Sequence, residues 1–308
     1  LLKKSIAKVL LVIILSILLG NWFVEGFQLY NQDSDVIYSS LAKSDYDYIQ
    51  LGEIRYGTKA AYYLLLAYVY GLFSMDSLRP IFLFNSFALL FIQFFVCGRS
   101  VKIWLFSIAF MLPFPIFYWL CSQWIRTSLA LFLFLLASIS LCSLIESRRR
   151  SLAYFLSVFL LFLTPLIHVY AILPALIFFA YISLDVKIIN PGPVSAFCFY
   201  AVALACSFLL GFHSQSNLVM STIFAIILIA SSFFYPGLIN ERNFSPAVLK
   251  LLWSGKLSCL LALPFASSSF LRILGFSFTL LVVELSFITS YLFDNKSSSR
   301  RDLKIIPP

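Results

Sequence analysis

Four groups of polar side chains interrupt a chain that is otherwise strongly apolar. The first is an acidic, tyrosine-rich segment that contains Asp45 and Asp47, and the second is the sequence Gln123-Trp-Ile-Arg126. The third and fourth are His168 and Arg272. An arginine side chain donates hydrogen bonds in a planar fork that matches two phosphate oxygens, so the two arginines suit chemistry on a phosphorylated substrate.

His168 is the leading candidate for a general base, because free histidine has a pKa of about 6.5. Asp45 and Asp47 are the alternatives, but a carboxylate needs burial to raise its pKa into that range. With Asp33 and Asp35 they form two Asp-x-Asp pairs, a pattern that can hold a divalent cation between phosphates and that also arises often by chance. The two histidines form no zinc motif, and the chain has no glycine-rich nucleotide loop. We therefore predict no resident metal and no cofactor.

The elements that carry these residues are expected to be membrane helices. Of the 308 residues 61% are hydrophobic and 11% are charged, whereas soluble domains have about 25% charged residues. At about 20 apolar residues per span, we predict an all-α, polytopic integral membrane protein with about ten (nine to eleven) transmembrane helices in a single domain over residues 1–308. The apolar runs lie at 9–26, 81–97, 103–119, 127–145, 151–167, 169–184, 194–212, 217–236, 252–267 and 270–292.

Lys and Arg positions predict the orientation of these spans, because positively charged loops stay in the cytoplasm. Arg148–Arg150 is the strongest such marker, and counting spans from it places both termini inside, including a basic tail over 293–308. The loop from Arg242 to Lys256 is then also inside, and the 27–59 loop is outside. This count holds if the short, tyrosine-rich segment 60–73 is an interfacial or re-entrant helix rather than a span. The net charge of +9 is thus an orientation signal and needs no nucleic acid partner.

In this topology all four polar groups lie on the outer side. Each also has a purely structural interpretation: Arg126 and Arg272 as anchors that reach the lipid headgroups, His168 as a turn residue, and the acidic segment as a solvated cap. Their convergence at one depth on one face favours a functional site. Glu284, inside the last span, is expected to be protonated or paired within the bundle, in a structural role.

Residues 40–180 resemble a known family. The sequence Gln123-Trp-Ile-Arg126-Thr-Ser-Leu-Ala, the basic Arg148–Arg150 loop and the span ending at His168 resemble the EpsG-like (Wzy-type) polysaccharide polymerases. That family has Ile-Arg-Gln-x-Leu-Ala at the start of a helix, a basic cytoplasmic loop, and a helix that closes in a His-containing turn. The segment Asp45-Tyr-Asp47-Tyr48 and the position of Arg272 at the start of a late helix are also similar. Thr127 stands where the family usually has Gln.

The resemblance implies a polymerase in the bacterial cytoplasmic (inner) membrane. It would transfer a glycan from a polyprenyl pyrophosphate carrier to a sugar hydroxyl on another lipid-linked repeat unit, at the outer face. Besides the two lipid-linked substrates, the expected partners are membrane lipids and a chain-length regulator. The implied roles are pyrophosphate binding by Arg126 and Arg272, proton transfer by His168, Asp45 or Asp47, and sugar stacking by Tyr48 and Tyr62.

Three other functions stay open on the sequence alone. A GT-C-type glycosyltransferase would depend on a divalent metal at an Asp-x-Asp pair, and an O-antigen ligase would use lipid A as its acceptor. A flippase or transporter for lipid-linked oligosaccharide belongs to a different class and needs several charges inside spans. By sequence, only Glu284 lies clearly in the middle of a span.

Overall fold

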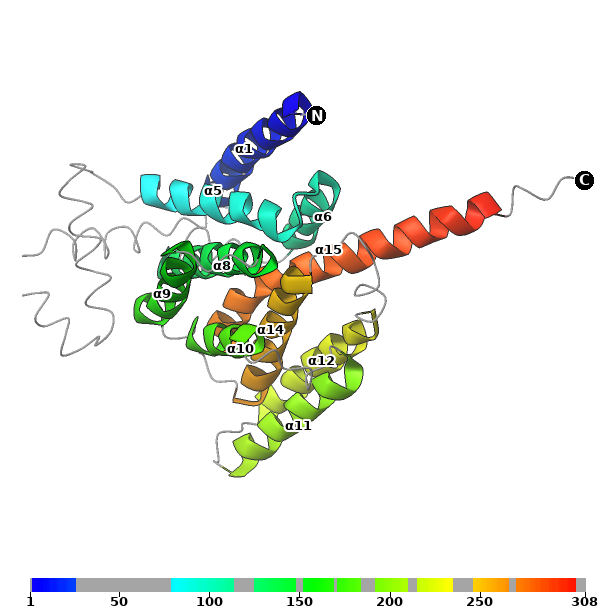
Figure 1. The fold of residues 1–308 in the computed structure, drawn as a ribbon. Coiled ribbons are helices and arrows are strands. Elements are labelled where there is room, and N and C mark those ends of the chain that lie inside the picture. The colour runs from blue at the N-terminus through cyan, green and yellow to red at the C-terminus, as the bar shows by residue number, and fades with distance from the viewer. Residues whose placement is uncertain are drawn as a thin grey trace, which may run out of the picture.

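The computed structural model describes residues 2–25, 79–113, 125–147, 152–168, 171–183, 192–209, 215–234, 246–265 and 270–302 (Figure 1). All regular structure in these ranges is helical, so the expected all-α class is confirmed there. The α-helices are α1 (Leu2–Glu25), α5 (Arg79–Val96), α6 (Val101–Met111), α8 (Ile125–Glu146), α9 (Leu152–Ile167), α10 (Ile172–Ser183), α11 (Pro193–Leu209), α12 (Gln215–Ser231), α14 (Pro246–Ala262) and α15 (Phe270–Asp302). Two short 3-10 turns, η3 (Ser232–Phe234) and η4 (Leu263–Phe265), extend α12 and α14.

Helices α5, α8, α9, α10 and α11 begin and end within three residues of the predicted apolar runs, whereas α1 and α14 begin six or seven residues earlier and α15 ends ten residues later. For example, α8 and α9 lie within two residues of the ends expected from the sequence. Among the described residues, the stretches Ile6–Val24 of α1 and Thr127–Ile145 of α8 are long and apolar enough to cross a membrane, and the other apolar helices are shorter.

Helix α8 lies at the centre of the bundle and contacts α5, α9, α14 and α15 (Figure 1). Its inner face contributes Ala130, Leu131, Phe134 and Leu135, none of which has exposed surface. Phe134 packs edge-on against Phe178 of α10, with ring centroids 6.1 Å apart. These contacts pack the middle of α8 against its neighbours.

The outer surface of α9 is apolar. Leu152, Phe155 and Phe159 lie on this helix and are more than half exposed. A helix that faces water carries polar residues on its outer face, so this surface is suited to a hydrocarbon environment. The exposed side chains therefore agree with the membrane location that the composition favours.

The predicted position of Lys256 in a cytoplasmic loop is wrong. Helix α14 already begins at Pro246, and Lys256 lies within it with no exposed surface. The charge suggested a loop because an unpaired lysine inside a membrane helix is costly. Its partner, Glu284, comes from α15 and offsets part of that cost. In addition, α15 continues as a helix through residues 293–302, the first part of the expected tail, and its last turns project beyond the other helices (Figure 1).

Gly255 allows α14 and α15 to approach closely. A Cβ atom at this position would lie 2.5 Å from Cδ1 and 3.0 Å from Cβ of Leu280 on α15. Small residues are common where two membrane helices pack against each other, because they let the backbones come together. The missing side chain therefore brings Lys256, the next residue, within reach of Glu284.

Candidate functional site

The start of α8 meets the end of α9 through a buried hydrogen bond. Oγ1 of Thr127 and Nε2 of His168 lie 3.0 Å apart, and either can donate, depending on the imidazole tautomer. Thr127 is 3% exposed and His168 is 5% exposed. This contact joins the segment that directly follows Arg126 to the histidine that closes the next helix.

The last turn of α9 holds His168 in this position. Pro165 lies inside the helix and has no N–H to donate to the carbonyl of Leu161. The hydroxyl of Thr164 donates to that carbonyl instead, at 2.7 Å. The backbone N–H of His168 donates to the carbonyl of Thr164 at 3.0 Å, and the carbonyl of His168 accepts from Ala171 at 2.9 Å. The helical geometry thus continues past the proline to the histidine.

Helix α5 also holds the start of α8. The side-chain amide of Asn85 donates a long hydrogen bond of 3.5 Å to the hydroxyl of Ser128, and both residues are buried. Because Ser128 follows Thr127 directly, consecutive hydroxyls point to α9 and to α5. The first turn of α8 is therefore held from two sides.

Of the predicted phosphate-binding residues, Arg126 lies in the first turn of α8 and Arg272 in the first turn of α15. The unpaired backbone N–H groups and the dipole at such a helix start favour an anion. The structure brings the Arg126 segment and His168 together. The other predicted site residues lie outside the described residues: Asp45, Asp47, Tyr48 and Tyr62.

The sequence did not reveal the role of Thr127. Its hydroxyl stands where the resembled family has a Gln amide, and by sequence it is only a departure from that pattern. The structure identifies it as a hydrogen-bond partner of His168. The sequence feature that could have indicated this contact is a polar residue directly after Arg126, at the start of an apolar helix.

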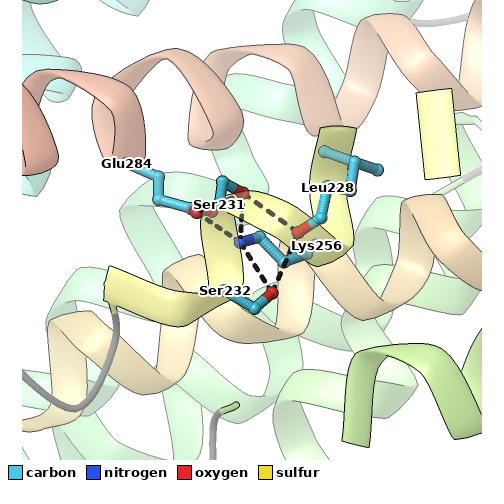
Figure 2. Close-up of polar contacts among 5 residues, drawn as sticks. All are labelled: Leu228, Ser231, Ser232, Lys256 and Glu284. Carbon is cyan, nitrogen blue, oxygen red and sulfur yellow. Dashed lines mark hydrogen bonds and ion pairs between the residues drawn. The ribbon is translucent and has the colours of Figure 1, made fainter. Parts of the chain in front are cut away.

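A second buried polar cluster joins α12, α14 and α15 (Figure 2). The ammonium group of Lys256 forms an ion pair with Oε1 of Glu284, and the two side chains are 0% and 2% exposed. The ammonium group of Lys256 also donates hydrogen bonds to the hydroxyls of Ser231, at 2.7 Å, and Ser232, at 3.2 Å. An ammonium group has three donors, and here each of them has a partner. The expectation that Glu284 is paired within the bundle is confirmed.

The two serine hydroxyls connect this cluster to the backbone of α12. Ser232 donates to the carbonyl of Leu228 at 2.9 Å. The hydroxyl of Ser231 lies 3.0 Å from the same carbonyl and 3.2 Å from Oε1 of Glu284, so its single proton can serve either acceptor. The sequence feature that could have indicated this cluster is a lysine that follows Ser254 and Gly255 within an apolar run.

No group of three or more His, Cys, Asp or Glu side chains that could hold a metal ion occurs within the ranges that the structure describes. The two Asp-x-Asp pairs of the first loop lie outside those ranges. Thr127 and His168, which the structure brings together, are suited to hydrogen bonding and proton transfer by their own side chains.

Comparisons with models of known protein families, with curated proteins and with solved structures find no match for this chain.

Proposed function

We propose that this chain is a polysaccharide polymerase of the bacterial cytoplasmic membrane, with about ten spans and both termini in the cytoplasm. It would join polyprenyl-pyrophosphate-linked oligosaccharide repeat units at the outer face. The observation that supports this most is the Thr127–His168 hydrogen bond, because it places a histidine beside the helix start that carries Arg126. A proton acceptor and a phosphate-binding group are the two functions that this reaction requires.

In the proposed reaction, an acceptor hydroxyl oxygen attacks the anomeric carbon of the donor glycan. The bond between that carbon and the pyrophosphate oxygen breaks, and polyprenyl pyrophosphate leaves as an anion. Arg126 and Arg272 stabilise this leaving group by donating hydrogen bonds to phosphate oxygens. His168 takes the proton of the attacking hydroxyl. Asp45 and Asp47 remain alternative bases, and Tyr48 and Tyr62 are proposed to contact the sugars.

Thr127 has a positioning role in this proposal. In the tautomer in which Nε2 of His168 donates to Thr127, the lone pair on Nδ1 is the basic site of the ring. Thr127 would then select that tautomer and fix the orientation of the imidazole, as the second partner of a catalytic histidine commonly does.

A glycan gel tests this function. The gene would be deleted and the strain complemented with wild type, Arg126→Ala, His168→Ala, or His213→Ala as a matched control at the other histidine. We expect both site variants to lose long chains while single repeat units still reach the surface, and His213→Ala to behave as wild type. Equal amounts of each variant in the membrane fraction exclude a folding defect. Normal chain lengths in Arg126→Ala and His168→Ala would overturn the proposal.

One observation favours a second candidate function, a flippase or transporter for lipid-linked oligosaccharide. The ion pair of Lys256 with Glu284 puts two charges inside helices, where the sequence suggested one. A cavity of about 270 Å³ lies beside them and is lined by Glu284, Ser231 and apolar side chains of α12 and α15. In the same gel, a flippase would leave single units on the lipid carrier inside the cell and none at the surface. Loss of activity in chelator would instead indicate the GT-C-type enzyme.

A further inference from the structure

A groove lies between α5, α8 and α9, toward the end of α8 that is opposite the Thr127–His168 contact. Its volume is about 560 Å³. Ser143 lines the groove and is 16 residues along α8 from Thr127, which corresponds to about 24 Å of helix. The groove is thus separate from the candidate site, and a ligand bound in it would be independent of the proposed polymerase function.

The walls of the groove are apolar and its polar groups are few. Phe95 of α5 and Phe132 and Leu136 of α8 provide much of the apolar wall. Arg99, the half-buried Ser140 and the exposed Ser143 provide hydrogen-bond donors. The third serine of the groove, Ser157, already donates its hydroxyl to the carbonyl of Ala153 at 2.8 Å, which leaves one cation and two hydroxyls to bind a ligand. Together with the long hydrocarbon surface, these groups match a ligand that has an apolar chain and an anionic head.

Arg99 is exposed and contacts the Phe95 ring, with its guanidinium carbon 5.6 Å from the ring centroid. Within the part of the chain that the structure describes, it forms no ion pair. Its position is set by the turn that ends α5, in which Gly98 has φ +63° and Arg99 has φ +61°. The N–H groups of Gly98 and Arg99 donate to the carbonyls of Phe95 and Phe94, both at 3.0 Å, which closes the helix.

We infer that this groove binds an anionic phospholipid of the surrounding bilayer. Its phosphate accepts hydrogen bonds from Arg99 and from the hydroxyls of Ser140 and Ser143, and one acyl chain lies along Phe132 and Leu136. The charge of Arg99 favours an anionic lipid over a zwitterionic one, whose ammonium group would face the guanidinium. The apolar walls favour a lipid over a free phosphate, which would leave them uncovered. Basic pockets between membrane helices are known to bind anionic headgroups.

Native mass spectrometry of the purified full chain tests this inference. The protein in detergent would be titrated with phosphatidylglycerol or with phosphatidylcholine, and the bound lipids counted. The test variant is Arg99→Asn, because asparagine removes the charge and tolerates a positive φ. The matched control is Lys102→Asn, which removes an exposed cation three positions away that does not line the groove.

We expect Arg99→Asn to weaken phosphatidylglycerol binding about fivefold, in keeping with the contribution of one basic residue to anionic-lipid binding. Lys102→Asn should leave it unchanged, and phosphatidylcholine binding should be weak in all three proteins. Leu136→Trp, which fills the groove, should weaken phosphatidylglycerol binding while Arg99 is intact. Equal phosphatidylglycerol binding by wild type and Arg99→Asn would overturn the inference. If glycerol phosphate bound as tightly as phosphatidylglycerol, the acyl chains would contribute nothing to binding, and the inference that the groove binds a lipid would be overturned.

Discussion

Replacing Lys256 or Glu284 singly should destabilise the protein, whereas replacing both together should largely restore it. The two side chains form a buried ion pair, and the ammonium group uses its other two donors on Ser231 and Ser232. A single replacement therefore leaves a charge inside the bundle without its counter-ion. We consider Lys256→Met, Glu284→Gln and the double variant.

The contacts predict the order of these effects. Lys256→Met leaves the Glu284 carboxylate with the Ser231 hydroxyl as its remaining donor in the cluster, so we expect the largest loss, about 3–5 kcal/mol. In Glu284→Gln the ammonium group of Lys256 keeps its hydrogen bonds to two serine hydroxyls and can donate to the amide oxygen that replaces Oε1. We therefore expect a smaller loss of stability, about 2–3 kcal/mol. In the double variant no charge is buried, and we expect a stability within about 1 kcal/mol of wild type.

Thermal unfolding in detergent micelles measures this order, followed by the loss of the monodisperse peak in size-exclusion chromatography. The three variants form a double-mutant cycle, which isolates the interaction between the two residues from the effect of each substitution alone. A matched control is Lys250→Met, which removes a half-buried lysine of the same helix that stacks over the Tyr181 ring at 5.5 Å. We expect this control to cost about 1 kcal/mol or less.

Two results would refute the reasoning. Additive losses in the double variant would mean that the two charges do not interact in the folded protein. A loss in Glu284→Gln larger than that in Lys256→Met would mean that the serine hydroxyls do not support the ammonium group as the contacts indicate.

Three further predictions concern packing and the candidate site. Gly255→Ala should cost about 1–3 kcal/mol of stability in the same unfolding assay, because the added methyl would overlap Leu280, and adding Leu280→Ala should recover part of it. Thr127→Val should reduce glycan chain length in the complementation assay without lowering the amount of protein in the membrane, and Thr127→Ser should not, because it keeps the hydroxyl that contacts the imidazole. Arg126→Lys and Arg272→Lys should restore little polymerisation, because lysine cannot bind phosphate in a bidentate fork; full activity of the lysine variants would make the two arginines membrane anchors.

The helix positions could be predicted from the sequence because uninterrupted apolar runs bounded by charges leave few alternatives in a chain with 11% charged residues. Helices α8 and α9 show this well, since Arg126, Arg148–Arg150 and the turn at His168 mark their ends. Counting spans placed the Arg126 segment and His168 on the same side of the bundle, and in the structure Thr127, the residue after Arg126, contacts His168.

The sequence by itself determined the apolar centres of the helices, because these depend on local hydrophobicity, but it did not determine where α14 begins or where α15 ends. Only the tertiary structure decided how the buried polar groups are paired. Thr127 and His168 are 41 positions apart, and Lys256 and Glu284 are on different helices, so no local pattern shows that they meet. A charge in an apolar run is costly when it is alone and acceptable when it is paired, and the partner is known only once the helices are packed. For this reason Lys256 looked like part of a loop in the sequence and lies in the core of the folded protein.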